Sequence, residues 1–369
     1  MADLDLSRLR RRPDVEADNL FAVDASDRLI LDEAAADIAA SSPGRLVVLG
    51  DRYGALTLGA ARLGASGVRT FQDSLLGELA LSANAAGTPV TSLPLGEAVL
   101  AGATVVLMQL SRSLAELDEW AGAIARFADP SVVVYAGGRI KHLSPAMNDV
   151  LRRSFAGLEV SLARQKSRVF VARTPLARDR AYPVREYNEE LGLWVVAHGA
   201  VFAGGRLDIG TRLLLSVLGG ARVDAASIVD LGCGTGILAA ALATARPAAS
   251  VIASDVSWAA VASATATMAA NGLSDRVAVV RDAGLSAQPA GTADLIVLNP
   301  PFHVGSTVHS GIAEGLFAEA ARVLRPGGEL WTVYNSHLGY RSALHRIVGE
   351  TREVTRNTKF TVTASRRSP

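Results

Sequence analysis

Apolar and polar positions alternate between two spacings along the second half of the chain. Short apolar runs such as SIVDL, SVIAS and DLIVL have the length of buried strands, and the segments between them, such as ILAAALATA and SWAAVASATATMAANGL, have the length and composition of helices. Strands that alternate with helices predict a parallel, doubly wound sheet. We expect the last helix, GIAEGLFAEAARVL, to stop at Pro326, Gly327 and Gly328, before a fifth strand, ELWTVYN.

The first half of the chain repeats this order of elements. The segment RLVVLGDRYGALTLGAARLG aligns with SIVDLGCGTGILAAALATA, and ATVVLMQLSR aligns with ADLIVLNPPF. Four pairs of landmarks then match: Gly50 with Gly232, Gly54 with Gly236, Asp73 with Asp255, and Gln109 with Asn299. We interpret the repeat as an internal duplication, although any two open α/β domains share part of this pattern. The expected fold is α/β, with two tandem Rossmann-like domains at residues 1–180 and 181–369 and mostly parallel sheets.

Composition and charge narrow the class of protein. Of the 369 residues, 49% are hydrophobic and 20% are charged, which predicts packed globular domains and argues against disorder. A single cysteine, Cys233, excludes a disulfide within the chain and fits a reducing cytoplasm. We expect no signal peptide, no membrane span and no metal site, because the chain lacks a run of about 18 apolar residues and its histidines lack ligand spacing. The net charge of +1 leaves nucleic acid open as a partner, since the local distribution of charge matters more than the total.

Positive charge gathers between the two predicted domains. Residues 152–185 hold nine lysines or arginines and two acids, a net charge of +7. Within this stretch EVSLARQKSRVFVAR alternates like a strand, so we expect a hairpin with a basic face. Such a cluster is either a solvated surface or a contact for nucleic acid.

The segment VDLGCGTG is a glycine loop between a predicted strand and a predicted helix. Its three glycines, Gly232, Gly234 and Gly236, let the backbone turn tightly and let a ligand approach the main-chain amides. Asp255 follows Gly236 by 19 residues, where an acid can accept the ribose hydroxyls of a nucleoside. NAD enzymes share these features, so the loop by itself does not name the ligand.

Three details favour S-adenosylmethionine (SAM) over NAD. The pattern G-x-G-x-G lacks the further glycine one turn later that dinucleotide sites carry. Asp230 offers a carboxylate to the ammonium group of SAM, and Asp282, after the third strand, offers one to the adenine amino group. Asp282 could equally cap a helix or turn, and Asp255 could be a simple strand-end residue.

Polar and rigid residues end the fourth predicted strand. In LNPPFH, Asn299 is followed by Pro300, Pro301, Phe302 and His303. An exocyclic amine on a base is a poor nucleophile, because its lone pair is conjugated into the ring. The Asn299 side-chain oxygen and the Pro300 carbonyl could accept its two hydrogen bonds while Phe302 stacks on the base, and such alignment promotes methyl transfer. A β-turn with two prolines is the simpler alternative.

The combination of VDLGCGTG, SDVS and NPPF resembles the class I SAM-dependent amino-methyltransferases. Four segments, VFAGGRLDIGTRLLL, MAANG, LNPPFH and RPGGELWTVYNSHLGY, more narrowly resemble the bacterial ribosomal RNA guanine-N2 methyltransferases. That family carries a degenerate N-terminal copy of the class I fold and a catalytic C-terminal copy. The resemblance is dense over residues 195–365, and AGGRIKHLSPAM, LARQKSRVF, NSHLGY and NTKF are closer to the large-subunit (23S) enzyme than to the small-subunit (16S) one.

The resemblance implies a role for each matching residue. The residues expected to hold SAM are Asp208, Gly210, Asp230, Gly232, Gly234, Gly236, Asp255 and Asp282, with Asp208 and Gly210 at the methionine end. The residues expected to hold guanine are Asn299, Pro300, Pro301 and Phe302. Three neighbours have open roles: His303 touches RNA or packs, Trp258 flanks adenine or packs in the core, and Cys233 is explained by its small size.

The first copy departs from the pattern. Arg52 stands where the second copy has Gly234, and Leu110 and Ser111 stand where it has the two prolines. We therefore expect residues 1–180 neither to bind SAM nor to catalyse, and instead to dock RNA through phosphate and sugar contacts. The target guanine has to be flipped out of its stack. We expect the two-copy chain to act as a monomer in the cytoplasm.

Other functions stay open from sequence alone. The chain could methylate another planar nitrogen, adenine N6 or a protein glutamine, although those families more often place tyrosine after the prolines. It could be a non-catalytic RNA-binding assembly factor that kept the fold, but intact Asp255 and Asn299 argue against this. An NAD enzyme is the third alternative. The exact nucleotide, and whether the substrate is naked rRNA or an assembled subunit, does not follow from the sequence.

Overall fold

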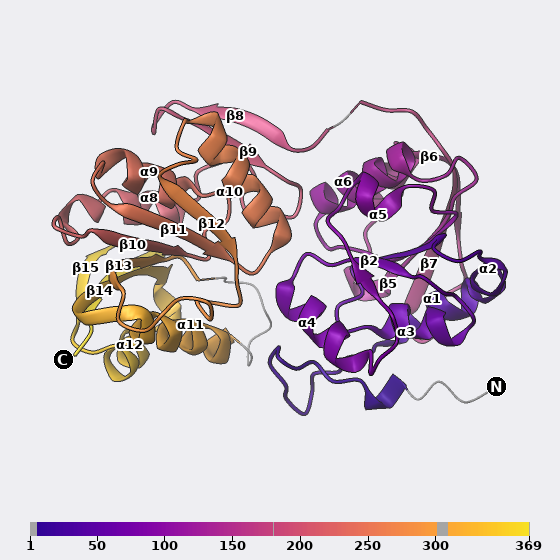
Figure 1. The fold of residues 1–369 in the computed structure, drawn as a ribbon, viewed down its shortest axis with the longest axis horizontal. Coiled ribbons are helices and arrows are strands. Elements are labelled where there is room, and N and C mark those ends of the chain that lie inside the picture. The colour runs from indigo at the N-terminus through magenta and orange to yellow at the C-terminus, as the bar shows by residue number, and fades with distance from the viewer. Residues whose placement is uncertain (1–5, 180, 301–308, 369) are drawn as a thin grey trace. The chain divides into compact units, whose positions relative to one another are not determined.

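The computed structural model describes residues 6–179, 181–300 and 309–368. The chain divides into two compact units, Met1–Tyr182 and Pro183–Pro369, which are labelled by element in Figure 1. Each unit contains its own seven-stranded sheet with helices on both faces. This arrangement confirms the α/β, doubly wound fold that the alternating pattern predicts.

The N-terminal unit is built on a sheet of order β3-β2-β1-β4-β5-β7-β6. Its strands are β1 (Leu46–Leu49), β2 (Arg69–Phe71), β3 (Thr91–Ser92), β4 (Val105–Gln109), β5 (Val133–Arg139), β6 (Phe155–Val160) and β7 (Ser167–Pro175). Its helices are η1 (Leu6–Arg8), α1 (Ala25–Glu33), α2 (Ala35–Ala40), α3 (Ala55–Arg62), α4 (Leu75–Asn84), α5 (Glu97–Leu100), α6 (Leu114–Phe127), η2 (Ile140–His142) and α7 (Pro145–Arg152). Helices α1, α2 and α3 bury their apolar sides in one core beneath the sheet.

The C-terminal unit is built on a sheet of order β12-β11-β10-β13-β14-β16-β15, with a separate β8–β9 hairpin. Its strands are β8 (Val184–Asn188), β9 (Leu193–Ala197), β10 (Ser227–Leu231), β11 (Ser250–Asp255), β12 (Val277–Arg281), β13 (Ala293–Leu298), β14 (Leu324–Asn335), β15 (Thr351–Arg356) and β16 (Phe360–Arg366). Its helices are α8 (Ile209–Leu215), η3 (Leu218–Gly220), α9 (Ile237–Ala245), α10 (Trp258–Ala270), α11 (His309–Val323), η4 (Ser336–Leu338) and α12 (Arg341–Ile347). Helices α8, α9 and α10 share one core, and α11 and α12 share the core on the other face.

The two sheets have the same strand order, as an internal duplication predicts. In each unit the five strands from β1 to β5, or from β10 to β14, are parallel, and the last two strands are antiparallel. Leu49 pairs with Met108 and Leu231 pairs with Leu298. The next residue along each fourth strand is Gln109 or Asn299, so the expected match of these two positions is confirmed.

The expected match of Asp73 with Asp255 is wrong by one residue. The Gly50 N–H donates to the Phe71 carbonyl, and the Gly232 N–H donates to the Ser254 carbonyl. The residue that follows Phe71 is Gln72, so Gln72 occupies the place of Asp255. The connection between glycine loop and second strand is one residue shorter in the first copy, which an alignment at a constant offset does not reveal.

Two further expectations need correction in the C-terminal unit. Helix α11 ends at Val323, and β14 already begins at Leu324, so the RPGG segment belongs to the strand. The pairing of β13 with β14 is irregular there, between Ala293 and Leu295, and Gly327 has a left-handed φ of 76°. The bulge places the turn residues inside a strand, which the sequence rule for helix ends does not foresee.

Candidate active site at the glycine loop and the end of β13

The glycine loop between β10 and α9 bends through three left-handed residues. Gly232, Gly234 and Gly236 have φ angles of 73°, 54° and 78°, a region that side chains disfavour. A Cβ on Gly236 would lie 2.8 Å from the Met268 side chain, so this glycine also permits close packing of α9 on α10. A Cβ on Gly232 would meet no atom of the described residues within 4 Å. The loop is therefore tight on its helix side and open on its other side.

Asp255 holds this loop in shape. One carboxylate oxygen accepts the Gly234 N–H at 3.0 Å, and the other accepts the Ser257 N–H at 2.9 Å. The strand that ends at Asp255 lies next to β10, so the sheet itself delivers the carboxylate to the loop. The structure thus brings Asp255 and the glycines together, as the sequence predicts, and adds a direct bond between them.

Asp230 is fully buried at the end of β10. Its Oδ2 accepts the Ala239 N–H at the start of α9, at 3.0 Å, and its Oδ1 has no partner among the described residues. Burial, together with the negative charge of Asp255, raises the pKa of Asp230 to about 7. A buried oxygen without a donor beside an open loop fits a cationic or donating ligand group.

Asn299 follows β13 and has a fixed amide. Its nitrogen donates to Thr211 Oγ1 at 2.9 Å and to Asp208 Oδ2 at 3.3 Å. Its side-chain oxygen is buried and accepts no hydrogen bond from the described residues. The two acceptors on the nitrogen side fix which end of the amide is the oxygen. The structure therefore presents a free acceptor at the position where the sequence predicts the bond to a base amine.

Asp208 has a double task. It is the N-cap of α8, where its carboxylate accepts the Gly210 N–H at 2.9 Å and the Thr211 N–H at 3.1 Å, and it also receives the Asn299 amide. A Cβ on Gly210 would pack tightly, at 3.0 Å from the Asp208 carboxylate and 3.1 Å from the Phe360 ring. The predicted contact of both residues with the methionine end of SAM stays a prediction.

Other predicted residues have structural partners. Asp282 is buried and accepts the Ser286 hydroxyl and, at 3.0 Å, the Ala287 N–H, which agrees with the turn-capping alternative. Trp258 packs edge-on against His198 with ring centroids 5.1 Å apart. Cys233 is buried in the loop, and burial raises the pKa of its thiol well above the ordinary value. A nucleophilic thiolate is not what this environment favours.

Part of the predicted guanine site is not described. Pro300 is buried directly after Asn299. Pro301, Phe302 and His303 lie outside the described residues, so their predicted roles stay predictions.

The corresponding loop of the N-terminal unit has a similar backbone and different surroundings. Gly50, Arg52 and Gly54 keep left-handed φ angles of 71°, 54° and 103°, although Arg52 is not a glycine. The indole of Trp120 fills the space over Gly50, since a Cβ there would lie 2.8 Å from Trp120 Cη2. Both units keep the left-handed backbone of the loop, but an indole covers the first glycine in the N-terminal unit, whereas no described atom lies over Gly232.

The carboxylate of Asp230 also has a replacement in the N-terminal unit. Asp51, from the loop itself, accepts the Leu56 and Thr57 N–H groups at 2.7 Å each. Thr57 matches Ala239 at the offset that aligns Gly54 with Gly236. Burial raises the pKa of Asp51 to about 6.

The Asn299 arrangement is repeated with different residues. The Gln109 amide nitrogen donates to Asp27 and to Ser26 Oγ at the start of α1. The start of α1 and the start of α8 thus each hold an amide at the end of the fourth strand of their sheet. Nothing in the sequence connected Thr211 with Asn299, Ser26 with Gln109 or Trp120 with Gly50.

The expected basic hairpin is confirmed as the β6–β7 pair. Its charges are partly neutralised within the unit. Arg178 donates to Asp118 at 2.9 and 3.1 Å, and Arg173 lies 3.6 Å from Glu159. Lys166 and Arg168 have no acidic partner among the described residues and are exposed. The count of +7 therefore overstates the charge that a partner would meet.

The described ranges contain no group of three or more His, Cys, Asp or Glu side chains that could hold a metal ion. Within the same ranges, no helix has the length and apolar character of a membrane span.

Two family models match the chain. The methyltransferase small domain matches residues 192–364, and the RLMG N-terminal domain matches residues 2–176. Among curated relatives, the ribosomal RNA large subunit methyltransferase G of Ectopseudomonas mendocina (strain ymp) is 36% identical over 363 residues and covers 96% of each chain. That of Streptomyces avermitilis is 37% identical over 368 residues and covers 96% of this chain and 95% of the relative.

A solved structure shares the fold of nearly the whole chain. The T. thermophilus 16S rRNA N2 G1207 methyltransferase (RsmC), in complex with AdoMet and guanosine, matches with a TM-score of 0.73 at 22% identity. The match covers 91% of this chain and 92% of that one.

Proposed function

Because the chain belongs to the family of the ribosomal RNA large subunit methyltransferases G, we propose that it methylates the N2 amine of a guanine in 23S rRNA. It is an enzyme that uses S-adenosylmethionine. The observation that carries the choice of an amine is the Asn299 side-chain oxygen, which is buried, oriented and without a donor among the described residues.

The residues of the C-terminal unit fit SAM. Gly232 and Gly234 present open backbone, the carboxylate of Asp255 lies at the loop, and Asp230 has a buried oxygen that lacks a donor. We assign the ammonium end of SAM to Asp230 and the ribose end to Asp255. The cofactor supplies a methyl group on a sulfonium, which transfers to a nitrogen without prior activation.

In this reaction the protein has to align the guanine amine with the methyl group of the cofactor. Asn299 Oδ1 accepts a hydrogen bond from the guanine amine, which orients the nitrogen lone pair and increases its electron density. Thr211 and Asp208 keep the amide from rotating to present its nitrogen instead. The amine nitrogen would gain the methyl group as the bond from that methyl to the sulfonium sulfur breaks, which leaves a neutral thioether, and it would release one proton to solvent, so no strong base is needed. Pro301 and Phe302 complete the guanine site in this proposal.

The N-terminal unit has a separate role in this proposal. Trp120 and Arg52 occupy the former ligand loop, so the unit docks RNA and binds no second SAM. Lys166 and Arg168 on the β6–β7 hairpin are among the cations free to contact phosphate. With both copies on one chain, the enzyme acts as a monomer in the cytoplasm.

A methyl-transfer assay with labelled SAM tests the reaction. Unmodified 23S and 16S rRNA are offered separately, and nucleosides of the product are identified. We expect N2-methylguanosine in 23S rRNA, and a fall in kcat of about 100-fold or more for Asn299→Ala. SAM binding should persist in that variant.

The duplicated position supplies the matched control. Gln109→Ala removes an equivalent amide from the N-terminal unit and should leave kcat unchanged. Label in 16S rRNA would overturn the choice of subunit. Label in adenosine or in a protein glutamine, on naked RNA or assembled subunits, would overturn the choice of guanine.

A further inference from the structure

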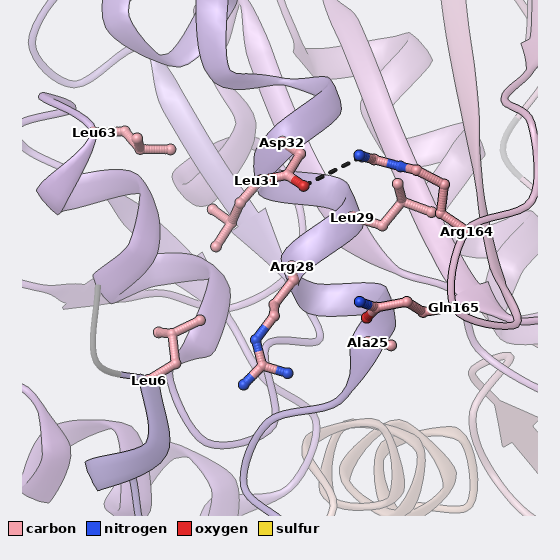
Figure 2. Close-up of a pocket in the computed structure, with 9 residues that line it drawn as sticks. All are labelled: Leu6, Ala25, Arg28, Leu29, Leu31, Asp32, Leu63, Arg164 and Gln165. Carbon is pink, nitrogen blue, oxygen red and sulfur yellow. Dashed lines mark hydrogen bonds and ion pairs between the residues drawn. The ribbon is translucent and has the colours of Figure 1, made fainter. Parts of the chain in front are cut away.

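A pocket lies in the N-terminal unit beside helix α1 (Figure 2). Its volume of about 390 Å³ is in the range of small-ligand sites. The lining comes from η1, α1, the end of α3 and the turn between β6 and β7: Leu6, Ala25, Arg28, Leu29, Leu31, Asp32, Leu63, Arg164 and Gln165. Five of the nine residues are apolar, and four carry groups that form hydrogen bonds.

The charges in the pocket are unequal. Arg164 lies 3.2 Å from Asp32 and 3.6 Å from Glu33, so its charge is matched. Arg28 is exposed on α1 and has no acidic partner among the described residues, and Figure 2 shows its guanidinium extended without an ion pair. The pocket therefore presents one unmatched guanidinium, a group that suits phosphate.

The turn at the pocket has an unusual backbone. Gln165 and Lys166 both have left-handed φ angles, 46° and 58°, and the turn is closed by two bonds between Arg164 and Ser167 at 2.8 and 3.0 Å. Two-residue hairpin turns of this kind favour Asn-Gly or Gly-Gly, because most side chains are strained there. The Ile140 N–H also binds the Lys166 carbonyl at 2.9 Å. A strained turn that carries Gln and Lys in place of glycine supports a functional role for these two side chains.

The leucine residues of the lining belong to the core of the unit or pack against it. Leu29 and Leu31 are buried members of the core beneath the sheet, and Leu63 packs against it. The edges of these leucines that reach the pocket offer a base an apolar contact, and the Gln165 amide can form hydrogen bonds with a base edge. Leu162, on the same hairpin, is 88% exposed and adds an apolar contact beside the cations.

We propose that this pocket binds one unstacked nucleotide of the substrate rRNA, with its base on the leucines and its phosphate on Arg28. The inference rests on the proposed function, because it supplies the docking site that the N-terminal unit needs. Binding of RNA would let phosphate replace the Asp32 carboxylate at Arg164, since an exposed ion pair contributes little to stability. The pocket then holds a nucleotide outside the catalytic centre and fixes the position of the RNA.

The test uses the full chain and unmodified 23S rRNA. Arg28→Glu should raise the KM for rRNA at least about tenfold while kcat and the Kd for SAM stay unchanged. Arg126→Glu is the matched control, since Arg126 is exposed on α6, has no acidic partner among the described residues and lies outside the pocket lining. It should change the KM less than about threefold, the size of a general charge effect.

A second pair of variants fills the pocket without changing charge. Ala25→Phe should raise the KM for rRNA as Arg28→Glu does, and Ala36→Phe, on the exposed side of α2, should not. Arg28→Ala should also reduce the slope of log K against log salt by about 0.7, the value for one contact to a single strand. Circular dichroism checks that each variant is folded.

The outcomes separate the two proposals. Equal effects of Arg28→Glu and Arg126→Glu, with no effect of Ala25→Phe, would overturn the pocket and leave only general charge attraction. Effects that appear with assembled subunits and not with naked rRNA would point to a protein partner and also overturn it. RNA binding is measured directly by filter retention, so a failure of methylation with intact pocket-dependent binding would count against the proposed function and not against the pocket.

Discussion

At the scale of single residues, a side chain here is often fixed by a partner far away in the sequence. Asn299 depends on Asp208 and Thr211, which lie about ninety positions earlier. The sequence could predict the glycines, Asp255 and Asn299, because each carries its own chemical signal at the end of a predicted strand. It could not predict that Thr211 orients the amide, since only the fold brings α8 to the end of β13.

Asp230 gives the first prediction at this scale. Its pKa is about 7 in the ligand-free protein because it is buried. An ammonium group beside it favours the ionised form, so a proton has to leave below pH 7 for SAM to bind. The Kd for SAM should therefore fall as pH rises from 5.5 to 7, by up to about tenfold per pH unit.

Isothermal titration calorimetry across that pH range checks the linkage, with proton release read from buffers of different ionisation enthalpy. Asp230→Asn keeps an oxygen for the Ala239 N–H and cannot ionise, so its weaker binding should not vary with pH. An unchanged pH dependence in this variant would assign the titration to another group.

At the scale of elements, the glycines of the loop differ in their surroundings: Gly236 packs against α10, and Gly232 borders open space. Gly232→Ala introduces a left-handed alanine into open space and should cost about 1–2 kcal/mol of stability, while SAM affinity falls steeply. Gly236→Ala adds a collision with Met268 and Ala264 and should cost about 2–4 kcal/mol. Urea denaturation and SAM titration of the two variants give the comparison. Equal losses of stability in the two variants would contradict the conclusion that Gly232 borders open space.

Trp120 gives the element-scale prediction for the N-terminal unit. It is buried, packs edge-on against Phe71 with centroids 5.9 Å apart, and covers Gly50. Trp120→Ala should lower the free energy of unfolding by about 3–5 kcal/mol. SAM stoichiometry should stay at one per chain, because Arg52 remains in the loop and Gln72 stands where a carboxylate is needed. Calorimetry that finds two sites would show that the indole alone had closed the first one.

The elements themselves differ in how well they could be predicted. The strands and helices between residues 227 and 298 agree with the prediction, because the buried side of each element is visible in its hydrophobic pattern. The start of β14 did not follow it, since Pro326 and the two glycines signal an end, and the pairing with β13 tolerates them as a bulge. The β8–β9 hairpin, which bonds to α10 through Asn271, also escaped prediction.

At the scale of the whole molecule, the duplication was visible because the two glycine loops and the two fourth strands keep their spacing. The shift of Gln72 against Asp255 was not visible, since only backbone bonds reveal it. Each unit has its own sheet and its own core. We therefore expect residues 183–369 to fold without the first unit.

The isolated C-terminal unit should bind SAM with the Kd of the full chain and methylate 23S rRNA with a KM at least about tenfold higher, because the phosphate contacts of the first unit are lost. Calorimetry and the methyl-transfer assay measure the two quantities. An unchanged KM for rRNA would contradict a docking role for residues 1–182.

An amide at the end of the fourth strand is held twice in this chain. Asn299 is hydrogen-bonded to α8, and Gln109 is hydrogen-bonded to α1. In the proposed division of roles the N-terminal unit carries out no chemistry, so its copy of this contact serves the architecture of the fold alone. The loss of stability in Gln109→Ala then measures what such a contact contributes to folding, and the loss of kcat in Asn299→Ala measures what the second copy contributes to the reaction.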